Sequence, residues 1–187
     1  MLRELLQKIS WNLRNDRACL YGRFGMTIYN VKDGQARVVR RIQKKNQVVN
    51  DAREVMLQLL AQDATAIPAV QNKIWSLSVG VVGTPPQITD TGLLGEVWAS
   101  AFAFPAECAI TALSPTFEIV VNKTLPTTEA NGNTLREAGI FTRGTLDDPY
   151  TSANRRMYCR QTHSPIEKVA TMQIVYDWRL GITVEGA

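Results

Sequence analysis

The sequence predicts a mainly β protein: an antiparallel β-sandwich of about seven or eight strands with one packed helix and an N-terminal helical arm. Short apolar segments, separated by turn residues at nearly even spacing, indicate antiparallel strands. Near the C-terminus, residues 171–183 alternate between apolar and polar, which indicates a long strand with one buried face. The repeated strand-helix rhythm of a doubly wound fold is not found.

The N-terminal segment is predicted to be an amphipathic helix. Its apolar stripe consists of Leu2, Leu5, Leu6, Ile9 and Leu13. Such a helix either folds back on its own domain or docks against a neighbouring subunit, and the stripe is therefore a candidate assembly interface. Residues 12–25 are rich in turn formers and predict an irregular connection. We accordingly divide the chain into an arm with its connection, 1–25, and a sandwich domain, 26–187.

A β-hairpin is predicted next, with strands at 26–31 and 35–42 joined by Asp33-Gly34, a dipeptide that favours a tight turn. Basic residues cluster on its second strand: Arg37, Arg40, Arg41, Lys44 and Lys45. They predict either a solvated strand face or a contact with an acidic partner surface or DNA. No aromatic residues interleave with them, so nucleic-acid binding is left open but not favoured.

One helix is predicted in the body of the protein, over residues 51–62. Asn50 is a suitable N-cap, and apolar residues follow at helical spacing, so this helix should lie with one face on a sheet. The further predicted strands are 74–82, 96–104, 117–121 and 134–142, and the last strand follows a polar loop at 143–156.

The composition limits the chemistry that the chain can perform. The 187 residues, 45% of them hydrophobic, suit one globular domain, and a net charge of +4 is only mildly basic. His163 is the single histidine, which excludes paired-histidine metal motifs, and we interpret it as a surface or loop residue. Cys19, Cys108 and Cys159 are scattered and predict reduced thiols from cytoplasmic synthesis. No apolar run predicts a membrane contact.

Catalytic residues are not evident. Carboxylates that could act as an acid-base pair are Glu137, Asp90 with Glu96, and Asp147 with Asp148, but turn or cap roles explain the aspartates better. A nucleophile elbow and a phosphate-loop lysine are both missing from the sequence. We therefore expect no enzymatic activity, no cofactor and no metal site.

Four segments, in order, resemble motifs of small structural proteins from tailed bacteriophages. Residues 46–60 resemble a helix start of the form N-x-V-x-x-A-R/K-E-x-L, and residues 79–96 resemble a "VGxGxTPP…DTxLxxE" stretch. Residues 137–141, EAGIF, resemble an "EAGLF" strand, and residues 160–180 resemble a terminal block "ARxxFPxIxKxxxxxLxxxWxI". The chain departs from the pattern at His163-Ser164, in the long 143–156 loop and in the first 25 residues.

The resemblance implies a virion structural protein with a β-sandwich body. Its partners would be other virion proteins and copies of itself, and its place would be the tail, the neck or a fibre attachment, after synthesis in the host cytoplasm. A capsid decoration protein is a second hypothesis. A host-glycan recognition module is a third, in which Tyr150 would stack on a sugar while Asp147 and Asp148 accept its hydroxyl protons. A hydrolase that uses acidic pairs is the fourth.

Overall fold

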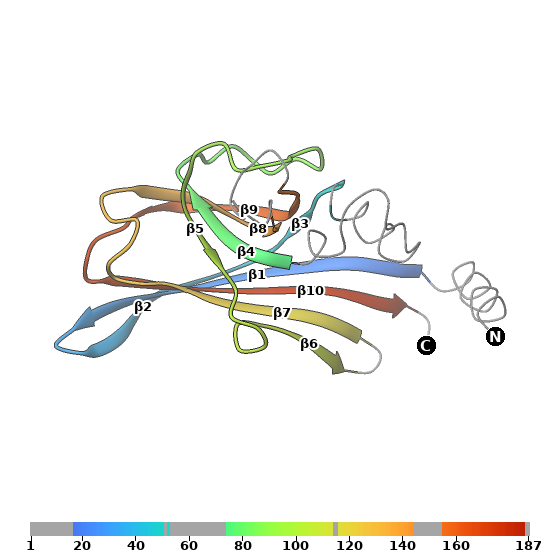
Figure 1. Cartoon of the computed structure of the whole chain (residues 1–187), viewed down its shortest axis with the longest axis horizontal. Helices are drawn as coiled ribbons and strands as arrows, with labels where there is room; N and C mark the ends of the chain where they lie inside the picture. The colour runs from blue at the N-terminus through green and yellow to red at the C-terminus, as the bar shows by residue number, and fades with distance from the viewer. Residues whose placement is uncertain (1–16, 51, 53–73, 114–115, 144–154, 186–187) are drawn as a thin grey trace.

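The computed structural model describes residues 17–50, 52, 74–113, 116–143 and 155–185. These residues form two five-stranded sheets in which all neighbouring strands are antiparallel. The sheets lie one above the other in Figure 1. The predicted mainly β class is therefore confirmed.

The first sheet has the strand order β2-β1-β10-β7-β6. Its strands are β1 (Arg17–Lys32), β2 (Gln35–Lys45), β6 (Cys108–Leu113), β7 (Thr116–Leu125) and β10 (Met172–Glu185). The central pair, β1 with β10, is in register from Arg17 opposite Glu185 to Asn30 opposite Met172. This long pairing joins the first and last strands of the described chain.

The second sheet has the order β3-β9-β8-β4-β5. Its strands are β3 (Gln47–Val48), β4 (Ile74–Gly80), β5 (Glu96–Ala101), β8 (Thr134–Thr142) and β9 (Met157–Glu167). The observed bounds of β8 are those predicted from the sequence. No helix among the described residues is long and apolar enough to cross a membrane.

One hydrophobic core joins the two sheets. Phe24, Tyr176 and Trp178 of the first sheet belong to the same buried cluster as Leu77 and Ile140 of the second. All five side chains are at most 1% exposed. The alternation predicted for β10 is therefore confirmed, because Ile174, Tyr176 and Trp178 are all buried between the sheets.

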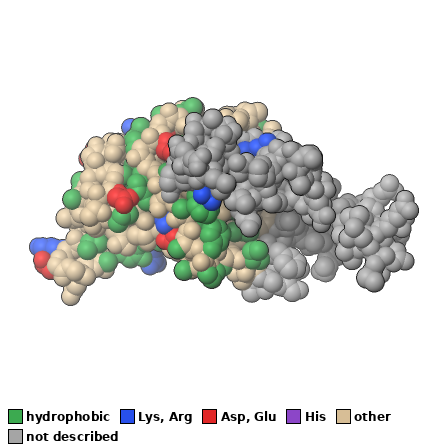
Figure 2. All heavy atoms as spheres, in the orientation of Figure 1, with side chains coloured by type: hydrophobic (Ala, Val, Ile, Leu, Met, Phe, Trp, Pro, Cys, Tyr) green, Lys and Arg blue, Asp and Glu red, His purple; other side chains and the backbone are tan. Residues whose placement is uncertain are grey.

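The predicted hairpin is also confirmed. Asp33 and Gly34 have φ angles of 52° and 75°, the left-handed pair that a two-residue type I′ turn requires. The hairpin of β1 and β2 projects past the rest of the first sheet at the left of Figure 1. Figure 2 shows charged side chains at this projecting end.

Three predictions about the elements are wrong. The segment 12–25 is not an irregular connection throughout, because β1 begins at Arg17. Pairing with β10 supplies the backbone hydrogen bonds there, which overrides the local turn preference. The described residues contain ten strands rather than seven or eight, since β3, β6 and β9 were not predicted. The strand predicted at 96–104 ends at Ala101.

The predicted helix 51–62 lies outside the described residues except for Ala52, which is buried in the core. The N-terminal arm lies outside them as well.

Candidate partner-binding surface

The five basic residues predicted as one contact are divided by the alternation of strand β2. Arg40 and Lys44 extend toward the second sheet. Arg40 Nη2 donates a hydrogen bond to Ser164 Oγ at 2.8 Å, and Lys44 Nζ donates one to the Thr162 carbonyl at 3.0 Å. Both acceptors belong to β9, so these two cations bridge the two sheets.

His163 lies beneath this bridge and not on the surface, so its interpretation as a surface or loop residue is wrong. It is 5% exposed, and its ring stacks parallel to Phe24 with 6.4 Å between ring centroids. Nδ1 lies 2.9 Å from the Ser164 carbonyl oxygen. Burial lowers the pKa of His163, and the nearby charges of Lys44 and Arg40 lower it further, against the opposing effect of the Ser164 hydrogen bond.

Arg41 and Lys45 lie on the opposite, outer face of β2. Lys45 is directly opposite Arg23 of β1, and Arg23 is directly opposite Arg179 of β10. Three cations therefore stand side by side on three neighbouring strands. We call Lys45, Arg23 and Arg179 the cationic row. All three residues are exposed. Arg41 lies on the same face four residues before Lys45, opposite Thr27.

Two carboxylates lie at the Arg179 end of the cationic row. Arg179 Nη1 is 3.4 Å from Glu118 Oε2, and Arg179 Nε is 3.8 Å from Asp177 Oδ1. Glu118 also accepts a hydrogen bond from the Tyr21 hydroxyl, and the Arg23 guanidinium lies 5.9 Å from the centroid of the Tyr21 ring. Among the described residues, neither Arg23 nor Lys45 forms an ion pair. Positive charge is therefore in excess at the other end of the row.

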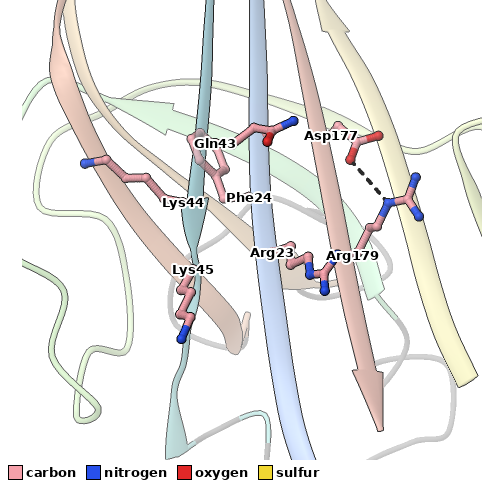
Figure 3. A pocket seen from close by; sticks show the side chains of 8 residues that line it. Arg23, Phe24, Gln43, Lys44, Lys45, Asp177 and Arg179 are labelled. Carbon is pink, nitrogen blue, oxygen red and sulfur yellow. Dashed lines mark ion pairs between the residues drawn. The ribbon is translucent and has the colours of Figure 1, made fainter. Parts of the chain in front are cut away.

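A shallow groove of about 640 Å³ contains the cationic row, and Gln43 and Asp177 also line it. Figure 3 shows Arg23 extending from its strand toward the strand that carries Arg179, with Asp177 and Arg179 joined as an ion pair. Arg37 is separate from this groove, because it lies opposite Asn30 near the hairpin turn.

Only part of this surface was predictable from the sequence. Lys45 and Arg41 were among the predicted contact residues, whereas Arg23 and Arg179 were not. Arg23 falls in the segment interpreted as an irregular connection, and Arg179 falls on the polar face of the predicted last strand. The alternation of apolar and polar residues over 171–183 indicated that Arg179 points outward. Nothing in the sequence indicated that β10 pairs with β1 and so places Arg179 beside Arg23.

Three of the carboxylates considered for catalysis lie in the described part of the chain, and each is bound to an arginine. Arg160 Nη2 lies 2.7 Å from Glu137 Oε2, and Arg160 Nη1 lies 2.8 Å from Asp90 Oδ2. Arg155 forms an ion pair with Glu96. These contacts give each of the three carboxylates a structural role. In the part of the chain that the structure describes, no three His, Cys, Asp or Glu residues gather as a metal site.

Cys108 and Cys159 are free and buried. Burial raises the pKa of Cys108 to about 11 and that of Cys159 to about 12. Neither thiol is therefore a candidate nucleophile at neutral pH.

The remaining candidate residues lie outside the described part of the chain. They are the arm residues Leu2, Leu5, Leu6, Ile9 and Leu13 and the loop residues Asp147, Asp148 and Tyr150.

The described residues thus define a protein of two packed antiparallel sheets with a cationic outer surface across β2, β1 and β10. Comparison of the chain with protein-family models, with curated proteins and with solved structures found no significant match.

Proposed function

We propose that this chain is a structural subunit of a tailed-bacteriophage virion, without enzymatic activity. It has a β-sandwich body, forms homo-oligomers and contacts other virion proteins in the tail, the neck or a fibre attachment. The observation that carries the proposal is the exposure of strand β2.

Strand β2 is eleven residues long, and ten of its positions are exposed. It lies at the edge of the first sheet, and within the described residues its backbone pairs with β1 alone. A long exposed edge strand is a template for pairing with other chains, and proteins that act alone usually shorten or cover such edges. Its basic side chains oppose indiscriminate pairing but still allow contact with a partner of complementary charge. An assembly role accounts for both properties.

A second observation supports the proposal. Three of the segments that resemble phage structural proteins are distant in sequence but meet at one buried ion cluster. Asp90 comes from the "DT" segment, Glu137 from the EAGIF strand and Arg160 from the start of the terminal block. Residues that hold the same structural cluster are expected to occur together, so we treat these three segments as one set.

Cryo-electron microscopy of the particle or complex that contains this chain tests the proposal. We expect density for two packed sheets in symmetry-related copies at the tail, the neck or a fibre base, with the β1–β2 hairpin at a subunit contact. Density on the capsid surface would favour the decoration hypothesis instead. Absence of the chain from purified particles would contradict a virion role of either kind.

The arm is tested separately by light scattering of the full chain. Leu5→Glu combined with Leu6→Glu places two charges on the predicted apolar stripe and is expected to reduce the oligomer mass. Arg3→Glu, on the predicted polar side, is the matched control and should leave the mass unchanged. Equal masses for all three proteins would contradict assembly through the arm.

A further inference from the structure

We infer that the cationic row binds an acidic segment of a partner protein, one that presents two or three carboxylates along a short stretch of chain. This inference rests on the proposed assembly function and names the chemistry of the partner.

The register of the first sheet carries the argument. Lys45, Arg23 and Arg179 are direct cross-strand neighbours, so their backbones are separated by about 5 Å from one strand to the next. Like charges directly opposite one another destabilise a sheet. Two successive like-charge pairs on three strands therefore oppose folding of the free protein, and an anion bound across them would relieve the repulsion.

The cations at the row also have the donors that a carboxylate requires. A guanidinium is a planar fork that binds a carboxylate through two parallel hydrogen bonds. Arg23 is exposed and forms no ion pair within the described residues, so its fork is available to a partner. Arg179 is held at one side by Glu118 and Asp177, which orients its head group at the groove.

The same surroundings favour a protein partner over nucleic acid. Asp177 lines the groove and interrupts its positive charge, so the groove suits a few spaced carboxylates better than the continuous line of phosphates of a nucleic acid. The aromatic residue in the groove lining is Phe24, which is 1% exposed and offers no stacking surface for a base. Gln43, also in the groove, supplies an amide that suits the polar rim of a protein interface.

Fluorescence polarisation with the purified full chain tests the inference, with labelled hexaglutamate peptide and a labelled short DNA duplex as probes at low ionic strength. We expect the peptide to bind and salt to weaken it. Arg23→Gln and Arg179→Gln should each weaken binding by about tenfold, the loss expected for one charge-assisted contact. The control is Arg136→Gln, an exposed arginine on the other sheet, which should change binding by less than about twofold.

Thermal unfolding supplies a second readout. Arg23→Gln removes the central cation of the row, so the melting temperature of the free protein should be unchanged or higher while peptide affinity falls. Hexaglutamate should raise the melting temperature of the wild type more than that of Arg23→Gln, because a ligand of the native state stabilises it by mass action.

Three results would overturn the inference. The first is that the peptide does not bind at low ionic strength. The second is that Arg136→Gln weakens peptide binding as much as Arg23→Gln does. The third is that the duplex binds more tightly than the peptide through the same residues, which would make the partner a nucleic acid. Failure here is distinguishable from failure of the proposed function. A chain located in the virion that does not bind the peptide refutes only the acidic partner, whereas a peptide-binding chain missing from the virion refutes only the location.

Discussion

The Arg160 guanidinium and the Glu137 carboxylate form an ion pair that water does not reach: their side chains are 1% and 0% exposed, and Nη2 lies 2.7 Å from Oε2. Arg160 Nε donates a hydrogen bond to the same oxygen at 2.8 Å. The other oxygen of Glu137 accepts the backbone N–H of Gly95 at 3.2 Å. A strand of the second sheet is thereby tied to its neighbour and to a loop.

Removing one partner of this pair should be costly. Arg160→Met leaves the Glu137 charge buried without compensation, and we expect the free energy of unfolding to fall by about 3–5 kcal/mol, measured by urea denaturation. Arg136→Met, on the exposed side of β8, is the control and should change it by less than about 0.5 kcal/mol. If Arg160→Met does not fold, Asp90→Asn, which keeps the Glu137 pair, should show a smaller loss of about 1–3 kcal/mol. A loss below about 1 kcal/mol in both variants would contradict this role.

His163 should make stability depend on pH. Its pKa is lowered in the folded protein, chiefly by burial, so below pH 6.5 the unfolded chain binds more protons than the folded one. Well above pH 6.5, His163 is neutral in both states and does not lower the free energy of unfolding. As the pH falls below 6.5, its effect lowers the free energy of unfolding by up to about 1.4 kcal/mol per pH unit.

The measurement is the melting temperature between pH 7 and pH 5 for the wild type and His163→Gln. The variant should lose less stability over this range than the wild type. Parallel curves would show that other groups cause the dependence.

The buried thiols should resist alkylation. Because burial raises the pKa of Cys108 to about 11 and of Cys159 to about 12, little thiolate forms at pH 8. Iodoacetamide should leave both residues unmodified in the folded protein and modify both in urea, as peptide mass spectrometry would show. Modification of either thiol in the native protein at the rate seen in urea would contradict the burial described here.

Neighbouring basic residues on β2 should behave differently. Arg40→Gln removes a hydrogen bond to Ser164 on the other sheet, and we expect a loss of stability of up to about 1 kcal/mol. Arg41→Gln changes the outer face and should leave stability unaffected, making it the matched control. Urea denaturation of both variants measures the difference. If the two substitutions have equal effects, the division of β2 into a bridging face and an outer face is wrong.

Local patterns predicted the elements that depend on a few adjacent residues. Asp33-Gly34 predicted the hairpin because only a few residue types tolerate its left-handed φ angles. Alternation predicted the buried face of β10, and the segment 134–142 was predicted as a strand with the bounds that β8 has. Strand β9 was missed because its buried positions include the polar residues Arg160, Gln161 and His163, which do not resemble a core strand.

The candidate surface was less predictable than the fold. A run such as 37–45 reveals where cations are concentrated but not which of them share a face with residues elsewhere in the chain. Arg23 and Arg179 are separated by most of the sequence and become neighbours only through the register of β1 with β10. Buried ion pairs such as Arg160 with Glu137 depend in the same way on contacts between distant segments.

The opening prediction of a mainly β chain thus followed from the residues alone, because side-chain periodicity and turn chemistry act over short distances. Folding in three dimensions decided the rest. Pairing of β1 with β10 made the segment from Arg17 onward a strand and placed Arg23 beside Arg179, and pairing of β1 with β2 placed Lys45 beside Arg23. Packing of the two sheets buried His163. Cross-strand register and packing join residues far apart in sequence, and no local pattern encodes those distances.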